Sequence, residues 1–193
     1  KHVGLNVAAD ASMYASMTGA EAGLVIISAD DPGMHSSQNE QDNRTFARFA
    51  RVPCLEPSDS QEAKDFTVAA FELSERFDTP VLLRLTTRVC HSTSAVELSE
   101  DERFKIDDAD FTNLESWRSE ASHIYNLQSE KKFPRNPTKY IMVPANARRR
   151  HPVIEQRIRD IAAAAEDWPG NRVEPGDHSL GIITAGVAYQ YAK

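Results

Sequence analysis

The stretch Gly23-Leu24-Val25-Ile26-Ile27-Ser28 is a continuous apolar run, and it decides the fold. Such a run is typical of a strand that is buried on both faces of a parallel sheet. Two further strands are predicted near residues 52–55 and 80–88, and segments with helical spacing of apolar residues lie between the runs. This alternation predicts an α/β fold: a parallel sheet with helices on both faces.

Four helices are expected around these strands. One covers residues 6–18, before the first strand, and another covers residues 38–51, after it. A third follows Ser58, which is spaced to form a capping box with Gln61. The fourth, near residues 153–167, carries isoleucines on one face.

Composition divides the chain into three parts. Residues 1–92 hold the alternating strands and helices, and residues 93–177 read as an irregular connector with helices. Residues 178–193 begin with the run Leu180-Gly181-Ile182-Ile183-Thr184-Ala185, which predicts a strand turning into a helix and the start of a second α/β domain. Because the chain opens and closes within such units, we expect it to be part of a longer protein.

The overall composition excludes several classes of protein. The 193 residues carry a formal net charge of -7, which argues against a nucleic-acid partner. No apolar stretch approaches the roughly 18 residues of a membrane span, and no signal peptide is visible. The two cysteines, Cys54 and Cys90, are expected to be buried reduced thiols, which favours a cytoplasmic location.

The loop over residues 29–42 gathers acids, amides, hydroxyls and one imidazole directly after the first predicted strand. Open α/β sheets bind ligands at this edge, outside the carboxyl ends of their strands. Pro32-Gly33 predicts a turn, and His35 and Ser36 precede a helix whose amino end favours a carboxylate. The alternative is an ordinary helix cap with solvated polar neighbours.

Two further groups of polar residues are candidates for binding. Lys1, His2 and Asn6 surround Gly4 at a second predicted corner of the fold. Arg84 interrupts an apolar strand and needs a partner, which is either an ion pair within the domain or an anion or neighbouring subunit. Thr86, Thr87, Arg88 and His91 cluster with Arg84 at the end of that strand.

One basic run is a further candidate for contacts, whereas three motifs common in enzymes are missing from the sequence. Arg148-Arg149-Arg150-His151 is either a solvated charge run or a clasp on another domain. The sequence has no cysteine cluster suited to an iron–sulfur centre, no evident phosphate-and-metal motif and no convincing Ser/His/Asp arrangement.

Stretches in four places resemble the α subunit of indolepyruvate ferredoxin oxidoreductase, a thiamine-diphosphate enzyme of the 2-oxoacid:ferredoxin oxidoreductase superfamily. A fifth, at residues 180–186, resembles the entry to the next domain of that family. The four are Lys1-His2-Val3-Gly4-Leu5-Asn6-Val7-Ala8-Ala9-Asp10, Ala29-Asp30-Asp31-Pro32-Gly33-Met34-His35-Ser36-Ser37-Gln38-Asn39-Glu40-Gln41-Asp42, Leu55-Glu56-Pro57-Ser58-Asp59-Ser60-Gln61-Glu62-Ala63 and Met142-Val143-Pro144-Ala145-Asn146-Ala147-Arg148-Arg149-Arg150-His151.

The resemblance implies that residues 1–92 are the later part of the domain that binds the pyrimidine ring of thiamine diphosphate. It implies oxidative decarboxylation of aryl 2-oxoacids to aryl-acyl-coenzyme A, with electrons passed to ferredoxin. The implied cofactors are thiamine diphosphate with Mg²⁺, and [4Fe-4S] clusters on parts of the subunit outside this chain. The implied partner is a β subunit in a hetero-oligomer, and these residues alone are expected to be inactive.

The implied site consists of His35 as a catalytic residue and of Lys1, His2, Asn6, Asp31 and Ser36 as substrate- or cofactor-binding residues. Two alternatives stay open. The chain could belong to another 2-oxoacid:ferredoxin oxidoreductase, or it could be a noncatalytic α/β domain that serves assembly.

Overall fold

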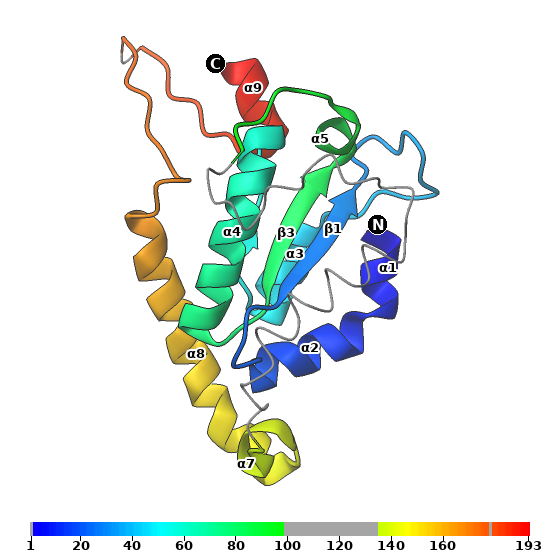
Figure 1. The fold of residues 1–193 in the computed structure, drawn as a ribbon, viewed down its shortest axis with the longest axis vertical. Coiled ribbons are helices and arrows are strands. Elements are labelled where there is room, and N and C mark those ends of the chain that lie inside the picture. The colour runs from blue at the N-terminus through cyan, green and yellow to red at the C-terminus, as the bar shows by residue number, and fades with distance from the viewer. Residues whose placement is uncertain (1, 99–134, 178) are drawn as a thin grey trace. The chain divides into compact units, whose positions relative to one another are not determined.

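The computed structural model describes residues 2–98, 135–177 and 179–193. Residues 1–96 and 138–193 form one compact unit, and residues 97–137, most of which fall outside the described ranges, form a second. The first unit holds a parallel three-stranded sheet in the order β1-β3-β2 (Figure 1). Its strands are β1 (Val25–Asp30), β2 (Cys54–Leu55) and β3 (Val81–Thr86).

Helices precede, separate and follow these strands. In the described part of the chain they are α1 (His2–Val7), α2 (Ala9–Thr18), α3 (Asn43–Ala50), α4 (Ser60–Phe77), α5 (Thr87–His91), α7 (Pro137–Tyr140), α8 (Pro144–Glu166) and α9 (Tyr189–Ala192), with the 3-10 turn η2 (Gly186–Ala188) before the last of them.

Alternate residues of the central strand β3 enter two apolar clusters, one on each face of the sheet. Leu82 packs with Leu5 of α1 and Ala47 of α3. Leu83 packs with Ala70 of α4, and Phe66 of the same helix meets Trp168 with their ring centroids 4.9 Å apart. The predicted α/β fold, with a parallel sheet and helices on both faces, is confirmed.

The helix starts differ from their predicted positions because carboxylates make the caps. Helix α3 begins only at Asn43, since the Asp42 side chain accepts a hydrogen bond from the Arg44 backbone N–H at 3.1 Å. The predicted box between Ser58 and Gln61 is wrong by one residue. Asp59 accepts from the Glu62 N–H at 2.9 Å, and the Glu62 carboxylate accepts from the Ser58 N–H at 2.8 Å.

Helix α8 starts at Pro144, well before the predicted residue 153, and includes Pro152. Arginines tie it to the end of α2: Arg150 Nε donates to the Met17 carbonyl at 2.8 Å, and Arg157 Nη2 donates to the Ser16 carbonyl at 2.6 Å. Burial lowers the pKa of Arg157 to about 10. Part of the predicted charge run therefore clasps the chain's own first helices.

Two expectations for local structure are wrong. Residues 180–185 form no strand, and Ile183 is fully exposed. An extended segment becomes a strand only by pairing its backbone with a neighbour, and none of the described strands lies beside this one. Cys90 is exposed, because the one turn of α5 buries Val89 instead, whereas burial raises the pKa of the half-buried Cys54 to about 12.

No helix in the described ranges is both long enough and apolar enough to cross a bilayer.

Candidate functional site

The loop after β1 begins with a tight turn. The Met34 N–H donates to the Asp31 carbonyl at 3.0 Å, and Gly33 between them has a φ of 80°. Proline in the second position and a positive-φ glycine in the third are the signature of a type II turn. The turn predicted at Pro32-Gly33 is present, and the Gly33 backbone leaves room for the His35 ring, whose Nε2 would lie 3.3 Å from a Cβ there.

The Asp31 carboxylate holds this loop against the segment that follows β3. Thr87 Oγ1 donates to Asp31 Oδ1 at 2.6 Å, and the Ser36 backbone N–H donates to Asp31 Oδ2 at 2.7 Å. The hydrogen bond from the Thr87 hydroxyl, followed by that from the Ser36 N–H, holds the pKa of Asp31 far below its usual range. A carboxylate that stays ionised well below neutral pH therefore joins the two segments at the edge of the sheet.

A buried ion pair lies directly below this edge. Arg84 Nε donates to Asp30 Oδ2 at 2.6 Å, and Arg84 Nη1 donates to Glu56 Oε1 at 2.6 Å. Asn43 adds hydrogen bonds to Asp30 from its backbone N–H at 3.0 Å and from its side chain at 2.9 Å. Of the alternatives for Arg84, the ion pair within the domain is confirmed. Arg84 lies on β3, Asp30 ends β1 and Glu56 follows β2, so the ion pairs connect the ends of all three strands.

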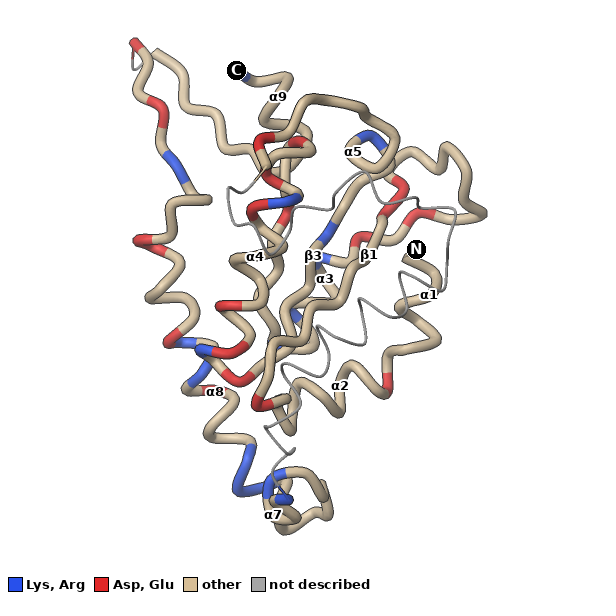
Figure 2. Tube along the Cα trace, in the orientation of Figure 1, with Lys and Arg blue, Asp and Glu red and all other residues tan. Residues whose placement is uncertain are grey.

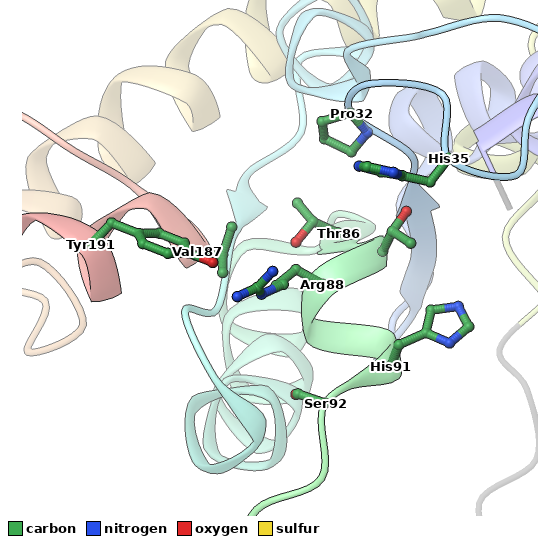
Figure 3. Close-up of a pocket in the computed structure, with 9 residues that line it drawn as sticks. Pro32, His35, Thr86, Arg88, His91, Ser92, Val187 and Tyr191 are labelled. Atoms are coloured by element: carbon green, nitrogen blue, oxygen red, sulfur yellow. The ribbon is translucent and has the colours of Figure 1, made fainter.

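A cavity of about 500 Å³ opens above the ends of β1 and β3 (Figure 3). Its volume is in the range of small-molecule sites in proteins. It is lined by Pro32, His35, Thr86, Thr87, Arg88, His91, Ser92, Val187 and Tyr191. His35 and Pro32 lie together on one side, Arg88 and Val187 lie opposite, and the His91 ring points away from Arg88 (Figure 3).

The residues predicted for the site occupy different surroundings. His35 lines the cavity, whereas Asp31 and Ser36 brace the loop that carries it. Asn6 donates its side-chain N–H to Gln41 Oε1 at 3.0 Å, which connects α1 to the same loop. His2 is fully buried, and neither ring nitrogen has a hydrogen-bond partner. Lys1 lies outside the described residues.

Three residues of the cavity wall were not predicted from the sequence, and one of them, Ser92, directly follows the predicted cluster at the end of β3. Val187 and Tyr191 come from the end of the chain, far from the loop in sequence. Gly186 brings them there: with a φ of 56°, it packs so closely on Glu56 that a Cβ would lie 2.5 Å from Glu56 Oε1. In the sequence, the only indication that the backbone comes so close to Glu56 was the pair of glycines, Gly181 and Gly186, around the apolar run.

Across the described ranges, no group of three or more His, Cys, Asp or Glu side chains is arranged to hold a metal ion.

Thr87→Val is expected to destabilise the fold more at about pH 7 than at about pH 3. A carboxyl with a lowered pKa stabilises the folded state above the unfolded pKa, about 3.9 for Asp, and this contribution is lost as the pH falls through the folded value. Without the Thr87 hydroxyl, the pKa of Asp31 moves back toward that usual value, so the variant loses stability mainly where Asp31 is ionised. Urea unfolding at the two pH values measures the difference.

Thr67→Val is the matched control. Its hydroxyl donates to the Ala63 carbonyl at 2.6 Å within α4 and touches no carboxylate. Its effect on unfolding should be the same at both pH values. An equal loss for Thr87→Val at both pH values would show that the Asp31 hydrogen bond contributes no charge-dependent stability.

The chain is similar over its whole length to proteins named "Indolepyruvate oxidoreductase subunit IorA": it is 44% identical to the one from Thermococcus kodakarensis and 39% identical to the one from Archaeoglobus fulgidus. The protein of that name from Methanothermobacter thermautotrophicus is 42% identical over 99% of the chain. The chain spans only 27%, 27% and 28% of the lengths of these three relatives.

The comparison with solved structures finds no match for the chain. Residues 4–167 match the family described as "Pyruvate flavodoxin/ferredoxin oxidoreductase, thiamine diP-bdg". That match includes the sheet, the loop with His35, and helix α8. The chain therefore belongs to this family of thiamine-diphosphate-binding oxidoreductase domains.

Proposed function

We propose that this chain forms one wall of the thiamine-diphosphate site in an enzyme that oxidatively decarboxylates aryl 2-oxoacids. The observation that carries the proposal is the cavity at the carboxyl edge of the sheet, where the loop with His35 meets Thr86 and Arg88. The substrate class is supported by the indolepyruvate in the names of the relatives.

The residues present fit the ring portion of such a cofactor. The Thr86 hydroxyl is buried at the cavity without a hydrogen-bond partner among the described residues, and a polar group of a bound cofactor or substrate would satisfy it. The two ring nitrogens of His2 are buried and unpartnered as well. These groups, with Asn6 and Lys1, are the proposed contacts of this chain with cofactor or substrate.

Thiamine diphosphate, when bound, supplies the electron sink that decarboxylation of a 2-oxoacid requires. The chain's own residues bind and orient. His35 binds the substrate carboxylate or transfers a proton, because imidazole is the side chain that titrates closest to neutral pH. Asp31 and the Ser36 backbone hold the His35 loop in place.

The remaining parts of the proposed enzyme lie elsewhere. We assign Mg²⁺ and the [4Fe-4S] clusters to segments of the subunit beyond these residues, and we expect a β subunit, coenzyme A and ferredoxin as partners in a cytoplasmic hetero-oligomer. Within the chain, residues 1–92 are the proposed pyrimidine-binding part, residues 93–177 the connector and residues 178–193 the entry to the next domain.

The test is a substrate comparison on the complete enzyme, with both subunits, thiamine diphosphate, coenzyme A and ferredoxin. Indolepyruvate and phenylpyruvate are expected to give at least about ten times the kcat/KM of pyruvate and 2-oxoglutarate, since burying an aryl ring contributes more than about 1.4 kcal/mol. Ferredoxin reduction is followed by absorbance. The 193-residue chain alone, as the control, should turn over none of them.

Each other outcome contradicts a different part of the proposal. Preference for pyruvate or 2-oxoglutarate would assign the chain to another 2-oxoacid:ferredoxin oxidoreductase. A fully assembled complex that oxidises none of the four acids would favour a noncatalytic assembly domain.

A further inference from the structure

The cavity contains two polar groups that the fold itself leaves unused. Thr86 is 5% exposed, and its Oγ1 has no hydrogen-bond partner, although its neighbour Thr87 donates to Asp31. A buried hydroxyl without a partner is unfavourable, because its lost hydrogen bonds to water are not replaced. The Thr86 side chain lies at the cavity between His35 and Arg88 (Figure 3), so a bound ligand could satisfy it.

The second group is the guanidinium of Arg88. Among the residues that the structure describes, it makes no hydrogen bond or ion pair, and its nearest described partner is the Tyr191 ring, with the guanidinium carbon 5.4 Å from the ring centroid. The carboxylates nearby are already engaged, Asp30 by Arg84 and Asp31 by Thr87. Neither of these carboxylates is therefore paired with Arg88.

The far wall of the cavity is apolar and aromatic. Val187 and Tyr191 lie on it, together with Arg88 (Figure 3). This wall is fixed to the start of helix α4 by Gln190, whose side-chain N–H group donates to Ser58 Oγ and Asp59 Oδ2, each at 3.0 Å. An arginine beside an aromatic wall is suited to a flat ring that carries a carboxylate.

We infer that Arg88 and Thr86 bind the carboxylate of the aryl 2-oxoacid and that Tyr191 packs against its ring. This inference rests on the proposed function and names the substrate-recognition residues at that site. The guanidinium donates charge-assisted hydrogen bonds to the carboxylate, and the Thr86 hydroxyl donates one more. His35, on the opposite side of the cavity, faces the ligand without being required for this recognition.

The experiment uses the complete enzyme carrying Arg88→Gln. We expect KM for indolepyruvate to rise about 10-fold or more, the effect of losing a charged hydrogen bond, with kcat changed by less than about 3-fold. Indole-3-acetate has no 2-oxo group, so its Kd from calorimetry reports binding alone. That Kd should rise by a similar factor. Thr86→Val should raise both constants by about 3- to 10-fold, the effect of a neutral hydrogen bond.

Arg76→Gln is the matched control, because Arg76 also lies over an aromatic ring, 4.9 Å from the Phe77 centroid, but outside the cavity. It should leave KM and Kd unchanged. Tyr191→Ala should raise KM for indolepyruvate more than KM for pyruvate, which a general loss of structure would not do.

Three results would overturn the inference: equal constants for Arg88→Gln and Arg76→Gln, no binding of indole-3-acetate to the wild-type enzyme, or displacement of indole-3-acetate by inorganic phosphate at equal concentration. The last would identify a phosphate site. If the enzyme instead prefers a non-aromatic 2-oxoacid, the proposed function fails, while an Arg88→Gln increase in KM for that acid would still support the carboxylate contact.

Discussion

Arg84→Met is expected to destabilise the fold by about 3–5 kcal/mol, the usual effect of removing one partner of a buried ion pair. The Asp30 side chain is fully buried, and the Arg84 side chain is only 5% exposed. The methionine would fill the space of the arginine stem but leave Asp30 without a counter-charge. The shift of the urea unfolding midpoint, with the slope held fixed, measures the loss.

Arg44→Met is the control for this prediction. Arg44 pairs with Asp42 at 2.7 Å and with the same Glu56 at 3.8 Å, but its side chain is 53% exposed, as is 45% of the Asp42 side chain, so its loss should matter by less than about 1 kcal/mol. Adding Asp30→Asn to Arg84→Met should recover part of the stability, because it removes the unpaired charge. Equal effects of the two arginine variants would mean that the Asp30–Arg84 pair does not hold the strand ends together.

His35→Ala in the complete enzyme is expected to lower turnover about 10²-fold or more if the imidazole transfers a proton. The position of the ring at the cavity, across from Arg88, supports that role (Figure 3). Steady-state kinetics with indolepyruvate measure the change. His35→Gln separates the two proposed roles, because glutamine can donate a hydrogen bond to a carboxylate but cannot exchange a proton. Proton transfer by His35 predicts that kcat stays as low as in His35→Ala, whereas carboxylate binding alone predicts that turnover recovers.

His151→Ala provides the comparison, since His151 is exposed on α8 and pairs only with Glu155, at 3.6 Å. It should retain normal turnover. Near-normal turnover of His35→Ala would remove this residue from the catalytic set, and the loop would then serve only to shape the cavity.

Strand positions could be predicted from the sequence because runs of apolar and β-branched residues favour strands. Of the described strands, only the central strand β3 is buried almost throughout; β1 lies at an edge of the sheet and its Ile27 is 60% exposed, so the prediction that β1 is buried on both faces is wrong. The three apolar runs became three parallel strands, with ends shifted by a few residues. Helix starts were harder to predict: the cap of α4 is Asp59 and not the neighbouring Ser58, and α3 begins after Asp42, five residues beyond its predicted start at residue 38.

The site could be predicted only where its residues are close in sequence. The loop at residues 31–36 was identified with its turn, but the partners of its side chains could not be. Thr87 donates a hydrogen bond to Asp31, 56 positions away in the sequence, and Tyr191 reaches the cavity from α9.

The strand expected at residues 180–185 is absent, because an apolar run does not reveal whether a neighbouring strand is present to pair with it. Ion pairs between distant segments could not be predicted either. Lysine and arginine residues gather along α7 and α8 (Figure 2), and two of them, Lys139 and Arg150, pair with Asp78 at the end of α4.

The bracing of the loop after β1 has a consequence for ligand affinity. A type II turn fixes its first residues, Asp31 ties its middle to α5, and Asp42 caps the helix at its end. The conformational entropy of these residues is therefore given up when the chain folds and not when a ligand arrives. A binding wall that is preorganised in this way keeps more of its contact energy as affinity.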